Sequence, residues 1–290
     1  MDLRAQPAPE VSVCVPVFNG RRFVADTLRS ILAQTFANFE LIVADNCSTD
    51  DTVAIVRGFD DPRLRLIVNE SNLGAIANFN KVLMEARGRR VKLVCADDLL
   101  VPTCLEEQLL ALDSCPGAVL CCSARRIVDQ YDRAWVSRRF PGRTGRINGR
   151  EAIARALRTG TNPFGEPAAV LMDRAALLRA GGFSNRWNFC VDLDLWCRLL
   201  DHGDAMIQDK ALCRFRVSPT SWSATLAHDQ PDEFARFLQE TVRRLPGVIS
   251  DEDIARAVRR ARLLARLRAG VYWWLSRGTQ RAGRLAQQGD

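Results

Sequence analysis

LVCADDL, residues 93–99, is the stretch that decides how the fold of this chain is interpreted. Its apolar residues run directly into the adjacent carboxylates Asp97 and Asp98, which indicates a buried strand ending in an acidic pair at the rim of a sheet. In open α/β sheets, ligands bind outside the carboxyl ends of the strands. Two carboxylates there suit a hard divalent cation that carries a phosphate-bearing substrate. A strand-to-helix turn capped by Asp98 is the structural alternative.

Strands and helices alternate before this stretch. The candidate strands are apolar, β-rich runs at residues 11–17, 39–44, 64–68 and 91–95. Segments with helical spacing of apolar residues separate them, so the order predicts an α/β fold with a parallel, doubly wound sheet. Asn19 and Asp45 follow the first two strands and would converge with the acidic pair on one edge of the sheet. That arrangement is typical of a nucleotide site.

Other nucleotide-binding and metal-binding classes are disfavoured. No GxGxxG follows the first strand and no GxxxxGK[ST] occurs, which argues against a dinucleotide oxidoreductase or a P-loop NTPase. The ten cysteines form no CxxC pair, and only two histidines are present, so a zinc site is not expected. The cysteines fit buried free thiols in a reducing cytosol.

The second half of the chain is less regular. Strands are expected at residues 118–123, 168–172 and 211–217, and helices at 103–112, 149–157, 174–180 and around 190–200. The segment 129–148 is polar, Arg-rich and too long for a simple connection. It is a candidate lid or antiparallel excursion.

Positive charge is concentrated near the C-terminus. The chain of 290 residues has a net charge of +7, and residues 233–290 hold twelve Arg against six Asp or Glu. No apolar run reaches the roughly 18 residues of a membrane-spanning helix. Residues 1–10 are polar and do not resemble a signal peptide. A cytoplasmic protein is expected, either free or peripheral at the inner face of the plasma membrane.

Five motifs in register, and a weaker sixth, resemble those of the inverting family-2 glycosyltransferases, which have the GT-A fold. They are VCVPVFN (13–19), similar to P-x-[YF]-N after the opening strand; DNCSTDDT (45–52), similar to D-[DN]-x-S-x-D-x-T; NLG (72–74), similar to N-x-G; CADD (95–98), similar to D-x-D-D; VDLDLWCRL (191–199), similar to E-D-x-D-L-W-x-R-L; and, more weakly, GEP (165–167) with GGF (181–183). The resemblance implies a GT-A fold with a C-terminal helical extension. It also implies transfer of a sugar from a nucleotide-diphosphate sugar.

The resemblance also implies roles for individual residues. The nucleotide site would comprise Pro16, Val17, Phe18, Asn19, Asp45, Asn72, Gly74, Ala96 and Asp97. Asp97 and Asp98 would hold a divalent metal, Mn²⁺ or Mg²⁺, that stabilises the diphosphate leaving group. Asp192 matches the catalytic base that takes the proton of the attacking hydroxyl, and a plain helix cap is its structural alternative. Glu166, Trp187 and Asp194 are implied as acceptor-side or supporting residues.

Three departures from the family pattern bear on activity. Cys95 replaces the first Asp of D-x-D, Val191 replaces the Glu of the E-D pair, and Ser218 stands where many members have a metal-binding His. Because Asp97 and Asp192 are retained, we expect an inverting transferase. It would use a UDP- or dTDP-sugar and a hydroxyl of a glycan or lipid-linked saccharide in cell-surface polysaccharide synthesis. The alternative is a non-catalytic nucleotide-sugar-binding subunit of a glycan-assembly complex.

The sequence predicts a catalytic domain over residues 1–228 and a basic helical extension over 229–290. An apolar stripe within 254–267 runs alongside arginines and is followed by VYWWL at 271–275. This pattern fits an anionic membrane surface, or packing on the catalytic body or on a second subunit as a homo-dimer contact. No nucleic-acid partner is expected, since no recognition motif accompanies the charge.

Overall fold

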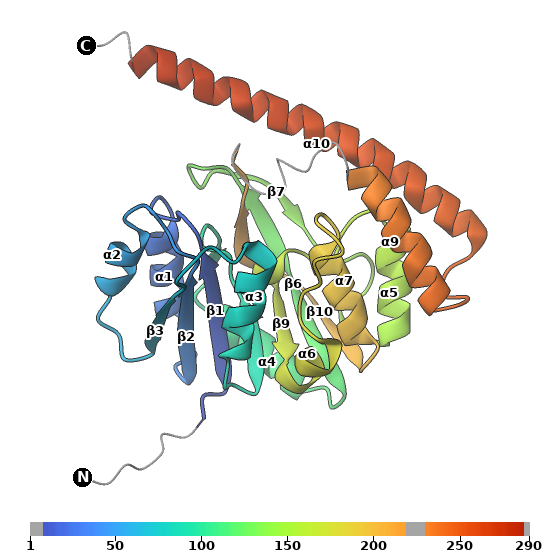
Figure 1. Cartoon of the computed structure of the whole chain (residues 1–290). Coiled ribbons are helices and arrows are strands. Elements are labelled where there is room, and N and C mark those ends of the chain that lie inside the picture. The colour runs from blue at the N-terminus through green and yellow to red at the C-terminus, as the bar shows by residue number, and fades with distance from the viewer. Residues whose placement is uncertain (1–7, 219–229, 287–290) are drawn as a thin grey trace.

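The computed structural model describes residues 8–218 and 230–286, with side chains described as far as residue 270. Its strands are β1 (Val11–Val17), β2 (Phe39–Asp45), β3 (Leu64–Val68), β4 (Arg90–Leu93), β5 (Leu99–Leu100), β6 (Ala118–Val128), β7 (Ala134–Arg138), β8 (Gly145–Ile147), β9 (Val170–Asp173) and β10 (Asp204–Arg216). Its helices are α1 (Val24–Leu32), α2 (Thr52–Arg57), α3 (Ala75–Met84), α4 (Cys104–Asp113), α5 (Gly149–Arg158), the short 3₁₀ helix η1 (Pro167–Ala169), α6 (Arg174–Ala180), α7 (Val191–Leu200), α9 (Gln230–Arg244) and α10 (Asp251–Ala286). All described strands join one sheet, whose main order is β3-β2-β1-β4-β9-β6-β10-β5 (Figure 1).

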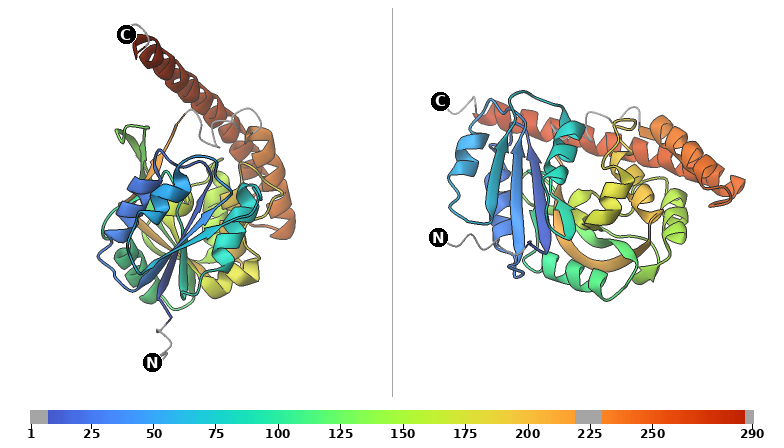
Figure 2. Two further views of the ribbon diagram at one scale, coloured as in Figure 1. Left: turned by 60° about the vertical axis from the view of Figure 1, so that its left-hand side comes forward. Right: turned by 60° about the horizontal axis from the view of Figure 1, so that its bottom comes forward.

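The first half of the sheet is parallel, as predicted. Strand β1 pairs in parallel with both β2 and β4, and β2 pairs in parallel with β3. Helices α1 and α2 lie on one side of these strands and α3 on the other (Figure 2, right). Every residue of β1 and β2 is buried, because helices cover both faces. The strand order reverses between β1 and β4, and such a switch point is where doubly wound sheets bind ligands.

The second half of the sheet mixes strand directions. Strand β9 is antiparallel to both β4 and β6 and so joins the two halves. Strand β10 is parallel to β6 and begins at Asp204, so the expected strand 211–217 covers only its later part. The segment 129–148 is an antiparallel excursion, in which β7 pairs with β6 and β8 with β10.

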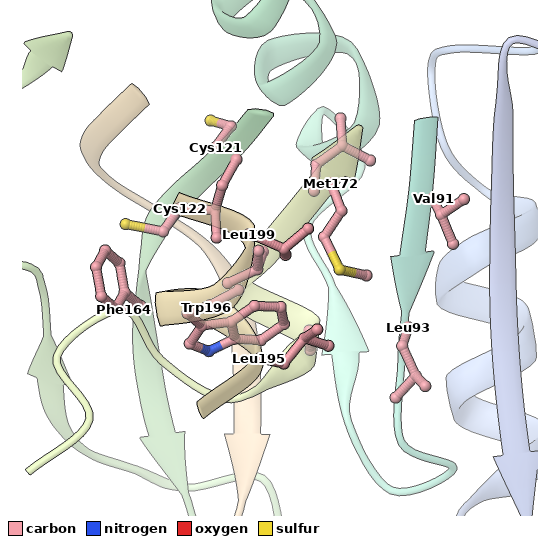
Figure 3. Packing of buried hydrophobic residues seen from close by; sticks show 14 of the residues in the cluster. Val91, Leu93, Cys121, Cys122, Phe164, Met172, Leu195, Trp196 and Leu199 are labelled. Carbon is pink, nitrogen blue, oxygen red and sulfur yellow. The ribbon is translucent and has the colours of Figure 1, made fainter. Parts of the chain in front are cut away.

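Helix α7 is fixed to the sheet through a large apolar core. Trp196, Leu195 and Leu199 are fully buried. They lie over the face of the sheet that carries Cys122 of β6 and Met172 of β9 (Figure 3). The Trp196 indole N–H donates to the carbonyl oxygen of Gly165 over 3.0 Å, so the same side chain also holds the loop before η1. All ten cysteines are free thiols, as the sequence predicted.

The C-terminal helices pack on the body of the protein. Phe234, Phe237 and Leu238 of α9 are buried in the main core, and α10 adds Ala257 and Ala261 beside α5. Beyond this contact α10 continues as a long helix past the body (Figure 1). The expected domain boundary at 228/229 and the side chains of the VYWWL run, 271–275, lie outside the described residues. Among the described helices, none combines the length and apolarity needed to span a bilayer.

Candidate functional site

The loops after β1 and β2 are bonded to one another. Asn19, in a left-handed conformation with φ of 50°, donates its backbone N–H to Ser48 Oγ over 2.9 Å. Its side-chain Oδ1 accepts the backbone N–H of Thr49 over 2.8 Å. The Gly20 N–H donates to Thr52 Oγ1 over 2.8 Å. The motifs at 13–19 and 45–52 therefore form one rigid rim, above which the predicted residue Phe18 remains 49% exposed.

Asp45 lies at the end of β2 beneath this rim, close to the predicted residues of β1. It is fully buried and pairs in register with Val17, next to Pro16. Its Oδ2 accepts the Ser48 N–H over 2.9 Å, which ties down one side of the carboxylate. Its Oδ1 is buried and has no hydrogen-bond partner among the described residues. A buried acceptor without a donor is costly, so this oxygen fits an N–H supplied by a ligand.

A network of amides shapes the other side of the same rim, in which the predicted residue Asn72 is joined by the buried residues Asn46, Asn69 and Asn78, which were not singled out from the sequence. Asn46 donates to Asn72 Oδ1 over 2.9 Å, and Asn69 donates to both Asn46 and Asn78 over 3.0 and 2.9 Å. Asn72 Oδ1 also accepts the N–H of Gly74 over 2.8 Å. Gly74 has φ of 81° and open space where a Cβ would lie, so the predicted residues Asn72 and Gly74 leave the start of α3 uncovered.

The acidic pair lies in the short loop after β4, with Ala96 in the same turn. Asp98 is fully buried, and its Oδ1 accepts the backbone N–H of Arg216 over 3.0 Å. Its Oδ2 is buried without a partner among the described residues. Asp97 is partly exposed, so it is the more accessible carboxylate of the two. Burial raises the pKa of Asp97, and burial together with the Asp97 charge raises the pKa of Asp98 well above its usual range.

Arg216, at the end of β10, binds this loop and was not singled out from the sequence. Its Nε donates to the backbone oxygen of Asp97 over 2.9 Å, and its Nη1 donates to that of Asp129 over 3.2 Å. The guanidinium lies over the Phe23 ring at 4.6 Å. The sequence signal that could have identified Arg216 is its position two residues before Ser218, the residue that stands where many family members have a metal-binding His.

Asp192 occupies the first turn of α7 and is largely buried. Burial, and then the negative charge of Glu166, raise its pKa to about 8 against the opposing charge of the Arg125 guanidinium. Arg125 itself is ion-paired with Glu166 and almost fully buried. Arg125 is thus a second functional residue that the sequence analysis missed, since nothing in its β6 context distinguishes it from a surface arginine.

Four carboxylates from three separate segments lie near enough to Cys95 for their charges to act on its thiol. The pKa of the Cys95 thiol is raised well above its ordinary value, first by burial and then by the negative charges of Asp98, Asp97, Asp192 and Glu166. The structure thus brings together the predicted metal pair, the predicted base and one predicted acceptor-side residue. Because its pKa is raised, the Cys95 thiol stays neutral within this cluster.

The acidic pair fits a divalent cation only as a partial site. Within residues 8–218 and 230–270, no three His, Cys, Asp or Glu side chains are arranged to hold a metal ion. The unpartnered Asp98 Oδ2 and the accessible Asp97 are hard oxygen donors of the kind that Mn²⁺ and Mg²⁺ take. Such a cation would complete its shell with water or with the phosphates of a ligand.

Two predicted residues lie apart from this cluster. Asp194 forms an ion pair with Arg198 one turn further along α7. Trp187 is 7% exposed, and its ring packs edge-on against Phe237 of α9 at 5.7 Å between centroids. Trp187 therefore contacts the C-terminal helices in this structure, while Asp194 supports α7 itself.

Comparison with known proteins places the chain in a family. The model of glycosyl transferase family 2 matches residues 12–180, and the chain belongs to that family. The Mycobacterium tuberculosis protein MT1568 is 36% identical over 200 residues, which cover 66% of this chain and 62% of that protein. An Escherichia coli protein, UDP-Glc:alpha-D-GlcNAc-diphosphoundecaprenol beta-1,3-glucosyltransferase WfgD, is 36% identical over 99 residues, which cover 34% and 39%. The chain thus spans less than two thirds of the length of either relative.

Solved structures share the fold. Staphylococcus aureus TarS residues 1–349, in complex with UDP-GlcNAc, superposes with a TM-score of 0.67 and 20% identity, covering 86% of this chain and 70% of that one. The Pyrobaculum calidifontis mannosyltransferase PcManGT, in complex with GDP-Man and Mn²⁺, superposes with a TM-score of 0.66 and 20% identity, covering 98% and 80%. These neighbours and the family match confirm the predicted GT-A fold.

Proposed function

We propose that this protein transfers a sugar, with inversion, from a nucleotide-diphosphate sugar to a hydroxyl of a glycan or lipid-linked saccharide in cell-surface polysaccharide synthesis. The convergence of Asp97, Asp98, Asp192 and Glu166 around Cys95 carries the proposal. It joins a cation-binding pair and a candidate base in one site beside the switch point of the sheet. The family match supports this substrate class, as does the relative WfgD, whose name gives UDP-glucose as donor and a diphosphoundecaprenol-linked GlcNAc as acceptor.

The rim of the sheet would bind the nucleotide. The unpartnered Asp45 Oδ1 can accept the imide N–H of uracil or thymine, which favours a UDP- or dTDP-sugar. Asp97 and Asp98 would hold Mn²⁺ or Mg²⁺, which supplies charge neutralisation for the departing diphosphate. Arg216 keeps the acidic loop in place through the backbone oxygen of Asp97.

Asp192 would act as the base of a single displacement. The acceptor oxygen bonds to the anomeric carbon while the bond from that carbon to the phosphate oxygen breaks, and the nucleoside diphosphate leaves with the electron pair. Asp192 takes the hydroxyl proton of the acceptor in the same step. With a pKa of about 8, the ionised carboxylate of Asp192 is a stronger base than that of an exposed aspartate, which suits the removal of a hydroxyl proton.

The described part of α10 supports a peripheral membrane partner. Leu263 and Leu267 are 58% and 60% exposed, and Arg259, Arg262 and Arg266 surround them on the exposed side of the helix. Basic amphipathic helices of this kind lie in the interface of anionic bilayers. A lipid-linked acceptor would be presented at such a surface.

A non-catalytic nucleotide-sugar-binding subunit is the second candidate function. It is favoured by Cys95, Val191 and Ser218, which stand where the family pattern has Asp, Glu and His. A neutral thiol at Cys95 leaves one fewer carboxylate for the cation or the ribose. Both candidate functions predict that the protein binds a nucleotide-sugar donor, but only the transferase predicts turnover of that donor.

A donor panel tests the proposal. The full chain is incubated with UDP-, dTDP- and GDP-sugars and Mn²⁺, and release of nucleoside diphosphate is measured with and without a chelator. We expect chelator-sensitive release from a UDP- or dTDP-sugar. Binding of a donor without any release, with acceptor saccharides present, would favour the non-catalytic subunit, and neither binding nor release would contradict both.

A further inference from the structure

The segment 186–190, which leads into α7 and Asp192, is held by the C-terminal helices. Glu233 of α9 reaches this segment with its side chain and is itself buried. Its Oε1 accepts the backbone N–H groups of Phe189 and Cys190 over 2.7 and 2.8 Å. These are the N–H groups immediately before the first turn of α7, which begins at Val191.

Such N–H groups need an external acceptor. The first N–H groups of a helix have no partner within the helix, and a side-chain oxygen usually supplies one from the residue that caps it. Cys190 is the cap residue of α7 and makes no side-chain capping bond. Glu233, 43 residues further along the chain, accepts the backbone N–H of Cys190 itself, a bond that a Glu or Gln at the third helical position makes in a capping box. A carboxylate there also suits the positive end of the helix dipole.

Further contacts fix the same segment to the C-terminal helices. Trp187 packs edge-on against Phe237 of α9, and Arg186 pairs with Glu240 of α9. The guanidinium of Arg268, on α10, lies 5.1 Å from the centre of the Phe189 ring. The N-terminal end of α7 therefore contacts α9 and α10. The Trp196 side of the same helix packs in the core.

We propose that Glu233 is a positioning residue for the transfer step, and that it fixes the start of α7 so that Asp192 meets the acceptor hydroxyl. Asp192 lies two residues beyond Cys190, so a shift of the capped turn moves the base directly. The nucleotide rim is built from the loops after β1 and β2 and from the amides before α3, whereas the Glu233 bonds reach residues 189 and 190. Loss of the Glu233 bonds thus affects the base and leaves donor binding intact. The inference rests on the proposed transferase function.

Replacing Glu233 separates this role from simple packing. Glu233→Ala removes the acceptor, and Glu233→Asp withdraws it by one methylene, whereas Glu233→Gln keeps an oxygen that can accept both N–H groups. We expect Ala and Asp to lower kcat by about 10- to 100-fold, the scale of a misplaced catalytic group, with the donor Kd unchanged. Gln should retain kcat within about threefold, as expected when the hydrogen bonds survive and only the charge is lost.

Asp232→Ala is the matched control, since Asp232 is an exposed neighbour on the same turn of α9. Its kcat and donor Kd should equal those of the wild type. Unchanged kcat in Glu233→Ala or Glu233→Asp would overturn the positioning role, as would an equal fall of kcat in the Gln variant. If Ala does not fold, the comparison of Asp with Gln decides. Absence of turnover in the wild type itself would instead contradict the proposed function.

Discussion

Asp192 is placed where its own charge is disfavoured. Burial and the negative charge of Glu166 disfavour the ionised form, and the Arg125 guanidinium compensates in part, so its pKa rises from 3.8 to about 8. The folded protein therefore binds a proton at this position over a pH range in which the unfolded chain has released it. By linkage, this group makes the free energy of unfolding fall as pH rises from about 4 to about 8.

Asp192→Asn tests the base and the linkage together. We expect kcat to fall by about 100-fold or more, because an amide cannot take the acceptor proton. The same variant should be more stable than the wild type at pH 8, with the difference vanishing near pH 4, where both side chains are neutral. Melting temperatures measured across that range without added metal, with nucleotide binding as a control for folding, check both effects. Turnover near the wild-type rate would refute the assignment of the base.

At the scale of elements, α3 and the loops beside it depend on buried amides. Asn78 is 2% exposed, accepts a hydrogen bond from Asn69 and donates one to the backbone oxygen of Ala44 over 2.9 Å. This places a side chain of α3 under the end of β2, next to Asp45. The network thus couples the shape of the nucleotide rim to the packing of the helix.

Asn78→Leu removes these bonds at nearly constant volume. It removes one hydrogen bond to the Ala44 oxygen and leaves an Asn69 N–H without its partner, so the free energy of unfolding should drop by about 1–3 kcal/mol. Affinity for the nucleoside diphosphate should weaken as well, because Asn46 loses its support. Urea unfolding and titration calorimetry measure the two effects. Met84→Ala, at an exposed position of the same helix, should change neither, and an Asn78→Leu protein as stable as the wild type would contradict the network's role.

The sequence predicted the elements whose signals are local. The apolar runs of β1 to β4 and the polar residues after them, such as Asn19 and Asp97, were sufficient for the parallel half and its ligand edge. Strand β9 inserts antiparallel between β4 and β6. Its four residues, Val170–Asp173, give no sequence signal of whether the strand runs parallel or antiparallel to its neighbours. The start of β10 was missed because Asp209 and Lys210 interrupt its apolar pattern at an irregularity in the pairing.

The site was predictable in part, for the same reason. Asp97 and Asp192 lie in motifs with recognisable spacing, so the proposed metal pair and the proposed base could be named from the sequence. Arg125, Arg216 and Glu233 act through contacts across long sequence separations, and their own neighbours along the chain give no signal. Supporting residues reach a site through tertiary contacts, so they can be identified only once the structure is known. Residues of a local motif can be identified from the sequence.

At the scale of the whole molecule, charge and position single out α10. The helix begins at Asp251 with an acidic turn and packs on α5 through Ala257 and Ala261. Arg259, Arg262 and the leucines near them lie on the exposed side. Helix α10 thus presents a basic, partly apolar ridge formed by Arg259, Arg262, Leu263, Arg266 and Leu267. The helix itself runs along one side of the body (Figure 1).

Vesicle binding tests this ridge. A variant with Arg259, Arg262 and Arg266 all replaced by Ala should partition about 100-fold less onto phosphatidylglycerol vesicles, since each arginine near an anionic surface contributes about 1 kcal/mol. Arg256→Ala is the matched control, because Arg256 is already paired with Glu252 and Asp253. Co-sedimentation measures the partition, with phosphatidylcholine vesicles as the neutral reference. Equal sedimentation of wild type and triple variant would reject the membrane role, and loss of a dimer in the variant would assign the ridge to a second copy.

The ten free cysteines have a consequence for how the protein withstands heat. Eight of them are buried, and burial holds the thiols of Cys14, Cys122 and Cys197 in their unreactive, protonated form. Unfolding exposes all ten at once with ordinary reactivity, so disulfides absent from the folded state can form between them. In air, thermal inactivation thus becomes a one-way process governed by the rate of opening. With a reductant present, the same chain can return to its fold, and survival after heating then reports thermodynamic stability.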